Sequence, residues 1–435
     1  MKIRTFTFSL LLLIPLLSLA QGQSGPIGWA SVDANGQNGT TGGAGGSVVT
    51  VTNMADLITY TGMSTDPLII QIDGMILITP KGRYIDVNSN KTIIGIGPDS
   101  GISEGGFRVR NSNKNVIFMN LNIQDTFVEG DWDGKTNDFD GIQLTQSAHH
   151  IWVHKCTFLR QGDGALDITN GADYITVSHS YFGANNKVSL IGSSDTDTYT
   201  DRYKVTMHHN WFDKTTQRHP RVRFGWVHVF NNYYHDMGRY GFEEHGVSSN
   251  GYGIGVGVNA HIWSEHNYFE KCVYPSQFYD NTANPGYIID NGSHFVQSGN
   301  MLTRPDGLVW DPSDYYDYEL DPADEVKEIV MANAGTGDNT TSIADGLQLN
   351  GQLELSNFPN PFSEFTTLVF EMPEAGKVRI SLFDITGRKI SEIANEHRLA
   401  GKNEIRLQRN GLRRGIYLIS LEFKGRIITK KLAVH

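Results

Sequence analysis

The sequence predicts an all-β protein in which a parallel β-helix is followed by a small β-sandwich. Short segments of alternating apolar and polar residues recur through the middle of the chain. A stretch of small and polar residues separates them from a tail of similar short runs. Glycine supplies 47 of the 435 residues and aromatic residues 11%, which argues against disorder and favours a loop-rich β protein. The chain is long enough for one large domain and a smaller one.

The first 20 residues have the pattern of a signal peptide. Lys2 and Arg4 precede a continuous apolar run, and the small residues Ser18 and Ala20 indicate cleavage directly after Ala20. We therefore expect residues 1–20 to be removed and the protein to be secreted or displayed at the cell surface. No later apolar run in the sequence is long enough to span a membrane.

Repeated segments predict the coils of the β-helix, which we expect over residues 21–330. They open with a β-branched residue, alternate apolar with polar residues, and mostly end on aromatic residues. The segments are NVIFMNLNI (115–123), HIWVHKCTF (150–158), YITVSHSYF (174–182), KVTMHHNWF (204–212), WVHVFNNYY (226–234) and HIWSEHNYF (261–269). A base period of 22–24 residues with insertions is typical of stacked coils, whereas a propeller or a sandwich would give more even spacing.

One column of these repeats carries polar side chains that can bond from coil to coil. The seventh position holds Ser180, Asn210, Asn232 and Asn267, which we expect to hydrogen-bond along the helix axis. The recurring aromatic residues at the segment ends are expected to form the core of the coils. Histidine pairs such as His208–His209 occupy repeat positions that other coils fill with Asn, Thr or Ser, so stacked structural histidines are the favoured interpretation over metal ligands.

The tail forms a separate unit. Residues 331–350, which include ANAGTGDNTTSIADG, have the composition of a linker. Residues 351–435 contain the short alternating runs TTLVFEM, KVRISLFD, GIYLISLEF and IITKKLAV, which predict a small antiparallel β-sandwich.

Charge and cysteine content limit the functions that the chain can have. The formal net charge is −11, although the segment from Gly351 onward carries 14 Lys and Arg against 9 Asp and Glu. The remaining body is therefore strongly acidic, which argues against a nucleic-acid or anionic-membrane partner. Cys156 and Cys272 are too few for a disulfide framework, and either one bridge or two buried thiols is compatible with export.

Three arginines stand out in this acidic chain. In RHPRVRFG, Arg218, Arg221 and Arg223 occupy six residues, and the alternation after Pro220 predicts that Arg221 and Arg223 share one face of a strand. Carboxylates gather in two loops, DWDGKTNDFDGIQL (131–144) and GDGALDI (162–168). Arginines paired with aspartates, and aspartates that form turns, are the plain structural alternatives to a functional site.

Taken together, these segments resemble the pectate lyase family of polysaccharide lyases. The resemblance covers roughly residues 28–308 and implies a right-handed parallel β-helix. It rests on GWASVDANGQNGTTGGAGG, DFDGIQL, GDGALDITNGADYITVSHSYF, NNKVSLIGSSD, VTMHHNWFD and RHPRVRFG, in family order. The tail, with FPNPF, LFDITGRKI, GIYLI and KKLAV, resembles the C-terminal sorting domain of type IX secretion, which implies the secretion machinery as a partner.

The resemblance implies Ca²⁺-dependent β-elimination on de-esterified polygalacturonate, which yields 4,5-unsaturated oligogalacturonides. It implies Asp140, Asp163 and Asp167 as principal calcium ligands, with Asp138 in addition; carboxylate oxygens suit this hard cation. It also implies that Arg218 takes the C5 proton and that Lys187 and Arg223 bind substrate carboxylates. Because a free guanidinium stays protonated at ordinary pH, this role requires nearby cations that disfavour its charged form.

The sequence departs from the family pattern at one motif, and functions other than a pectate lyase are compatible with the fold. Where the family has Trp-Ile-Asp-His, this chain has Trp152, Val153, His154 and Lys155, and we expect that motif to be structural support. A pectin lyase that acts on methylated substrate, a polygalacturonase-type hydrolase and a non-catalytic pectin-binding protein are the alternatives. We expect a monomer.

Overall fold

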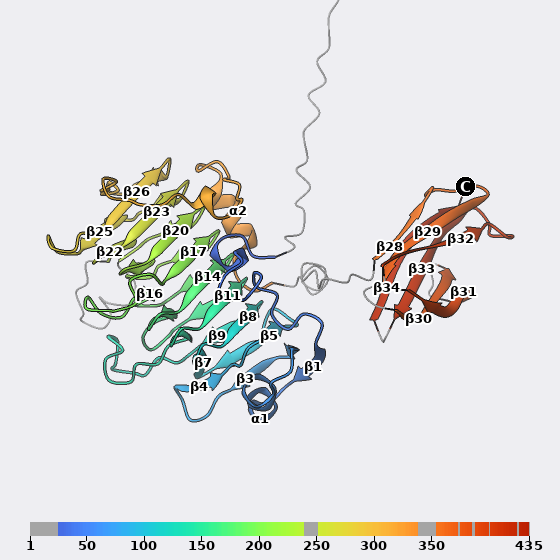
Figure 1. Cartoon of the computed structure of the whole chain (residues 1–435), viewed down its shortest axis with the longest axis horizontal. Helices are drawn as coiled ribbons and strands as arrows, with labels where there is room; N and C mark the ends of the chain where they lie inside the picture. Colours follow the sequence, from blue (N-terminus) through green and yellow to red (C-terminus); the bar gives the residue numbers. More distant parts are fainter. Residues whose placement is uncertain are drawn as a thin grey trace, which may run out of the picture.

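The computed structural model describes residues 25–238, 251–337, 354–372, 375–384, 388–399, 401–423 and 426–434 (Figure 1). The predicted signal peptide, residues 1–20, lies outside the described residues. Over the described part of the chain, the structure contains no helix of the length and apolarity needed to cross a membrane.

The body of the protein is a parallel β-helix, as predicted, and its coils follow one another from blue to yellow in Figure 1. In the described residues its strands form three parallel sheets of ten, eight and nine strands. Each complete coil adds one strand to each of the three sheets. Successive coils pair in register, for example Ile151 with Ile175 and Ile175 with Val205. This register aligns the repeated segments of the sequence.

The ten-stranded sheet consists of β1 (Ser47–Val51), β2 (Leu68–Ile72), β5 (Lys91–Gly95), β8 (Lys114–Met119), β11 (His149–His154), β14 (Asp173–Ser178), β17 (Lys204–His208), β20 (Trp226–Phe230), β23 (His261–Glu265) and β26 (Tyr287–Asn291). The eight-stranded sheet consists of β4 (Arg83–Asp86), β7 (Gly105–Val109), β10 (Ile142–Leu144), β13 (Leu166–Ile168), β16 (Leu190–Ile191), β19 (Arg221–Val222), β22 (Ile254–Gly257) and β25 (Ser276–Tyr279). The nine-stranded sheet consists of β3 (Met75–Leu77), β6 (Gly101–Ser103), β9 (Asn122–Gln124), β12 (Thr157–Leu159), β15 (Tyr181–Gly183), β18 (Trp211–Asp213), β21 (Tyr233–His235), β24 (Tyr268–Glu270) and β27 (His294–Val296).

A left-handed residue turns the chain between the ten-stranded and nine-stranded sheets. The sixth position of each repeated segment has φ between 44° and 54°, at Asn120, Lys155, His179, His209, Asn231 and His266. Asn and His tolerate this conformation better than most residues, which accounts for the polar column at this position; Lys155 is the exception. The sharp turn keeps strands of successive sheets close together in each coil.

The predicted polar ladder stands directly after this turn. Asn232 Oδ1 accepts a hydrogen bond from the backbone N–H of Asn210 at 3.0 Å, and Asn267 Oδ1 accepts one from the backbone N–H of Asn232 at 2.9 Å. Asn210 in turn accepts from the backbone N–H of Ser180 at 3.0 Å. The ladder satisfies turn amides that the sheets cannot reach, so it links successive coils inside the body.

Aromatic stacking fills the interior, as predicted. Phe158, Phe182, Phe212, Tyr234 and Phe269 stack in consecutive coils with ring centroids 4.4–5.2 Å apart, and all five are fully buried. Such burial is the main stabilising contribution to the body. The two cysteines are buried and unpaired, which resolves the two alternatives in favour of free thiols.

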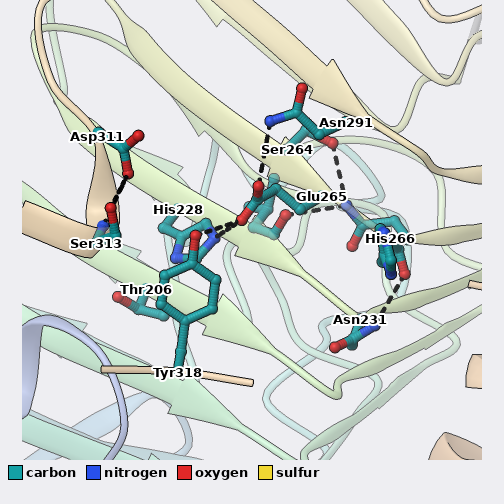
Figure 2. Close-up of polar contacts among 12 residues, drawn as sticks. Thr206, His228, Asn231, Ser264, Glu265, His266, Asn291, Asp311, Ser313 and Tyr318 are labelled. Carbon is teal, nitrogen blue, oxygen red and sulfur yellow. Dashed lines mark hydrogen bonds and ion pairs between the residues drawn. The ribbon is translucent and has the colours of Figure 1, made fainter. Parts of the chain in front are cut away.

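A return segment, residues 308–321, covers part of the outer face of the ten-stranded sheet. Figure 2 shows how it is fastened: Tyr318 Oη donates to Glu265 Oε2 at 2.7 Å, and His228 Nε2 lies 3.1 Å from the same oxygen. Asn291 Nδ2 donates to Glu265 Oε1 at 3.1 Å. Burial raises the pKa of Glu265, but hydrogen bonds from these partners outweigh it and lower the pKa to about 2. These bonds join the return segment to β20, β23 and β26 of the ten-stranded sheet.

The body extends into the stretch predicted as linker. Within the described ranges the helices are η1 (Trp29–Ser31), α1 (Met54–Ile58), η2 (Thr59–Met63), η4 (Pro312–Asp314) and α2 (Val326–Asn333). After α2, the backbone N–H of Gly335 donates to His179 O at 2.8 Å, and that of Thr336 donates to Thr157 Oγ1 at 3.0 Å. Residues 331–337 thus continue the body beyond the predicted end at 330, because α2 runs on to Asn333 and the next residues bond to the coils. Residues 338–350 lie outside the described residues.

The C-terminal unit is an antiparallel β-sandwich, as predicted. Its described strands form two sheets, β28 (Glu354–Phe358), β29 (Phe365–Met372) and β32 (Gly401–Gln408), and β31 (Lys389–Arg398), β30 (Gly376–Asp384), β33 (Gly415–Phe423) and β34 (Arg426–Val434). Leu368 and Phe370 of one sheet share a buried cluster with Val378, Ile380 and Leu421 of the other. The alternating pattern of each run therefore supplies one inner face.

Candidate functional site

The eight-stranded sheet presents a continuous row of outward-facing residues, one from each strand. Their neighbours along the strands, such as Ile142, Leu166 and Val222, are fully buried inside the coils. The row reads Asp86, Arg108, Gln143, Asp167, Leu190, Arg221, Gly255 and Gln277, in strand order from β4 to β25. Polar and charged residues of candidate function thus gather on one face of the body.

Three of the predicted calcium ligands lie together at the edge of this row. Carboxylate oxygens of Asp138, Asp140 and Asp163 lie within 4.8 Å of one another. Asp140 is buried, and its Oδ1 accepts a hydrogen bond from the backbone N–H of Gly164 at 2.9 Å. Its other oxygen accepts from Tyr84 Oη at 3.1 Å. The loop that precedes β10 and the loop that precedes β13 therefore converge on one point.

Asp167 lies beside this set but outside it. Its Oδ1 accepts a hydrogen bond from the backbone N–H of Leu190 at 2.9 Å. Burial and the charge of Asp163 raise the pKa of Asp167 to about 7, against the opposing charge of Arg218. Asp167 occupies its row position on β13, where its charge acts on Asp140.

The negative charges of these carboxylates repel one another. Burial, followed by the negative charges of Asp167 and Asp163, raises the pKa of Asp140 well above its usual range. Burial and a hydrogen bond with Asp163 also raise the pKa of Asp138. A cluster of partly buried carboxylate oxygens that repel one another fits a hard divalent cation such as Ca²⁺. Asp138, Asp140 and Asp163 would hold it, with Asp167 adjacent.

Lys187 enters the cluster from the neighbouring coil. It pairs by isolated bridges with Gly164 on one side and Gln217 on the other, and its buried ammonium forms an ion pair with Asp163. The same ammonium donates to the backbone carbonyl of Asp133, so Lys187 also holds the aspartate-rich loop that precedes β10. The predicted substrate-binding lysine therefore stands at the rim of the predicted metal site.

Arg218 occupies a bulge. Lys187 is paired with Gln217 and Leu190 with Arg221, so the coil of Arg218 has one more residue between these points than its neighbour. Arg218 has φ +67°, and such a bulge redirects the side chain. Its charge lowers the pKa of both Asp138 and Asp167, which places it close to the carboxylates.

The guanidinium of Arg218 has an unused donor. Its Nε is buried and has no hydrogen-bond partner among the described residues. The next residue, His219, is fully buried and lies within 2.7 Å of Thr215 Oγ1 and 2.8 Å of the backbone oxygen of Tyr252. This side chain anchors the coil, so Arg218 is presented from a firmly held backbone.

Arg223 is already paired. Its Nε lies 2.5 Å from Asp195 Oδ1, and its Nη1 donates to the carbonyl of Gly192 at 3.0 Å. The predicted substrate-binding arginine is thus held in place by a loop aspartate that sequence reasoning did not single out. Tyr84, which bonds to Asp140, was also missed. Both partners come from loops or strands whose contacts cross between coils, so no local pattern identifies them.

The departure at His154 and Lys155 lies away from this face. His154 ends β11 in the ten-stranded sheet, and its Nδ1 lies 2.9 Å from Ser178 Oγ. Its ring packs edge-on against His179, which stacks on His209 at 4.8 Å. Burial lowers the pKa of His154 to about 3. These rings pack within the sheet, which supports the structural interpretation of the motif.

Comparisons with known proteins identify the two parts of the chain. The family model described as pectate lyase matches residues 2–339, and the one described as secretion system C-terminal sorting domain matches residues 356–435. A pectate trisaccharide-lyase from Thermotoga sp. (strain RQ2) is 38% identical over 72% of this chain and 89% of its own length. Pectate lyase A from Dickeya chrysanthemi is 31% identical over 72% and 88%.

Solved structures show the same architecture. The crystal structure of a pectate lyase from Bacillus sp. N165 in complex with trigalacturonate is similar with a TM-score of 0.60 and 28% identity. The match covers 72% of this chain and 100% of that chain.

Proposed function

Since the chain belongs to the pectate lyase family, we propose that it cleaves de-esterified polygalacturonate by Ca²⁺-dependent β-elimination and leaves 4,5-unsaturated oligogalacturonides. One observation carries this proposal. Three mutually repelling carboxylates and the cations Lys187 and Arg218 converge from successive coils on one face of the eight-stranded sheet. Neither group alone suits a polyanionic sugar chain, but together they combine a metal site with cationic contacts.

The chemistry sets the requirements for this site. In β-elimination the proton at C5 of a uronate is removed and the C4 glycosidic oxygen leaves. The C5 proton is a poor acid until the adjacent carboxylate charge is neutralised. Calcium bound at Asp138, Asp140 and Asp163 would supply that neutralisation and reverse the local sign of the field.

The chain's own cations have distinct roles in the proposal. Lys187, at the rim of the carboxylate cluster, binds the uronate carboxylate, and Arg223, held by Asp195, binds a neighbouring one. Arg218, in the neutral guanidine form that nearby cations favour, accepts the C5 proton and becomes a guanidinium. Its bulge and its unpartnered Nε support this role, because the group is aimed by the backbone and is not engaged by a carboxylate of the described residues.

A single assay distinguishes this function from its alternatives. The full chain is incubated with polygalacturonate while the absorbance of a C4–C5 double bond is followed in the ultraviolet. We expect absorbance that chelator abolishes and Ca²⁺ restores. New reducing ends without absorbance would establish hydrolysis instead. Absorbance on highly methylated pectin in the presence of chelator would establish a pectin lyase, and binding without either product would establish a non-catalytic module.

We further propose export in two steps, since the C-terminal unit is a secretion sorting domain. The signal peptide, residues 1–20, would direct the first step and the domain from residue 351 the second. Mass spectrometry of the protein recovered from the cell surface and medium tests this, because a start after Ala20 is expected. Retention of residues 1–20 in the exported protein would contradict it.

A further inference from the structure

Arg221 is a cation on the site face for which the described residues provide no carboxylate. Arg223 is paired with Asp195, and Arg108, in the same outward row, is paired with Asp86 at 2.8 Å. Arg221 forms no ion pair with any described residue, and its Nε is buried without a hydrogen-bond partner. Burial and the charges of Arg223 and Arg218 lower its pKa. An arginine in this state is stabilised by any anion that reaches it.

Glycines make a trough for this side chain. Gly255 follows Arg221 in the outward row, and a Cβ added there would lie 2.8 Å from the Tyr252 ring and 3.2 Å from Arg221 Cγ. A Cβ at Gly257 would lie 2.9 Å from Arg223 Cγ. Any side chain on β22 at these positions would therefore displace the two arginines. Arg221 and Arg223 therefore occupy space that glycine leaves open over β22.

Aromatic rings form one wall of the trough. The Arg221 guanidinium carbon lies 4.5 Å from the centroid of the Tyr279 ring, and the rings of Tyr252 and Tyr279 are 4.9 Å apart. This contact holds the guanidinium plane. The Nε donor of Arg221 remains without a partner among the described residues beside this aromatic wall.

A further buried polar atom in this region lacks a partner. Oε1 of Gln277, which follows Gly255 in the outward row, forms no hydrogen bond with the described residues, and the hydroxyl of Tyr252 lies beside Arg221 and Tyr279. Buried groups without partners are rare in native proteins, and each one needs an explanation. With Arg221 Nε, they put cationic, hydroxyl and amide groups around one short stretch of the face.

We propose that Arg221, Tyr252, Gln277 and Tyr279 form a subsite that binds one galacturonate residue of the substrate through its carboxylate. The subsite lies on the side of the carboxylate cluster that faces the C-terminal coils. Arg221 stands two strands beyond Asp167 in the outward row, at about 10 Å, so we place the sugar bound there beyond the one whose carboxylate calcium would hold. This inference rests on the proposed function, since it extends the same substrate chain along the sheet.

The chemistry of the subsite selects a uronate over its methyl ester. A free carboxylate accepts hydrogen bonds from a guanidinium in a bidentate, charge-assisted manner, whereas an ester carries no charge. The aromatic wall can pack against the apolar face of a sugar ring, and Gln277 can bond to its hydroxyls. The enzyme therefore discriminates against esterification at this subsite as well as at the cleavage point.

The test compares Arg221→Gln with the unmodified full chain in the presence of Ca²⁺. We expect the KM for polygalacturonate to rise about tenfold or more, with kcat within about twofold, because the residue does not touch the reacting atoms. We also expect the preference in kcat/KM for polygalacturonate over partly methylated pectin to shrink severalfold. Arg221→Lys should recover part of the affinity. Arg202→Gln, the same change on the side of the ten-stranded sheet, should leave KM and preference unaltered.

A measurement on the unmodified chain covers the case in which the variant fails to fold. Phenylglyoxal modifies accessible arginines, and tandem mass spectrometry reports the modification of Arg221 separately from Arg218 and Arg223. Hexagalacturonate should protect Arg221, whereas its methyl ester should not. Equal modification with and without hexagalacturonate, or an unchanged KM and preference in Arg221→Gln, would overturn the subsite while lyase activity stands. Absence of the ultraviolet product in the unmodified chain would overturn the proposed function instead.

Discussion

The ammonium of Lys187 forms an ion pair with Asp163, one of the three carboxylates that gather within 4.8 Å. A cation required for substrate is thus held by a ligand proposed for calcium. Both side chains are largely buried, so their charges interact strongly. Lys187 and the metal therefore share Asp163, and the two sites are electrostatically linked.

Removing the lysine should separate these two roles. In Lys187→Gln we expect kcat/KM to fall by about 100-fold, equivalent to about 3 kcal/mol of lost charged contact with the substrate. The affinity for Ca²⁺ without substrate should rise, because the cluster loses a competing positive charge. Isothermal titration with Ca²⁺ measures this. In Arg223→Gln, whose partner Asp195 lies outside the cluster, activity should fall while Ca²⁺ affinity stays unchanged. A weaker Ca²⁺ affinity in Lys187→Gln would refute the linkage.

Asp140 should dominate metal affinity. Asp140→Asn removes the most buried carboxylate of the set, and we expect the Ca²⁺ concentration for half-maximal activity to rise at least about tenfold, or about 1.4 kcal/mol. Activity measured against buffered Ca²⁺ checks this. Asp99→Asn, at an exposed carboxylate elsewhere in the body, serves as the matched control and should have no effect. An equal response of both variants would remove Asp140 from the metal site.

Arg218 should be required for turnover but not for binding. In Arg218→Lys we expect loss of turnover with substrate affinity within about tenfold, or 1.4 kcal/mol, because the charge remains while the guanidinium is lost. Turnover is followed by ultraviolet absorbance and affinity by titration with hexagalacturonate. Retained turnover would exclude Arg218 as the proton acceptor.

The buried histidines should make the body sensitive to acid. Burial lowers the pKa of His154 to about 3 from an unfolded value of 6.5, so the unfolded chain takes up a proton that the folded chain refuses. The free energy of unfolding should therefore fall as the pH decreases from about 6.5 to about 3. Urea denaturation of His154→Gln across this range should show a shallower pH dependence than the unmodified chain. Raised carboxylate pKa values such as that of Asp167 act in the opposite direction, but equally in both proteins.

The control for this experiment is His397→Gln, at an exposed position of the C-terminal unit. It should leave the pH dependence unaltered. An identical slope in His154→Gln and the unmodified chain would show that His154 titrates normally in the folded state.

The polar ladder should contribute measurably to stability. Asn232 accepts from Asn210 and donates to Met207 O at 2.8 Å and to Asn267 Oδ1 at 3.1 Å. Asn232→Ala leaves these buried groups unsatisfied, so we expect a loss of about 3 kcal/mol in the free energy of unfolding. Ser293→Ala removes one bond at the end of the ladder, from the backbone N–H of Asn267, and the donation of Ser293 Oγ to Asp290 Oδ1, and should cost about 2 kcal/mol. Chemical denaturation compares them, and equal losses would contradict a ladder whose middle positions carry more bonds.

Much of the fold could be predicted because stacked coils repeat their residue types. The β-branched and aromatic columns predicted the interior, and the Asn column predicted the ladder, since each needs only one residue per coil. The linker boundary was harder, because the backbone of Gly335 and Thr336 bonds to the coils, in addition to the Thr336 hydroxyl, which donates to Asn122 Oδ1. Backbone hydrogen bonds leave no signature in composition.

The sequence alone determined which residue types reach the site face: carboxylates in two loops and arginines on one strand. Only the tertiary structure decided their partners, namely Asp163 for Lys187, Asp195 for Arg223 and none among the described residues for Arg221. The physical reason is that charges meet across coils of unequal length. An extra residue at Arg218 or a glycine at Gly255 changes where a side chain points without altering the repeat.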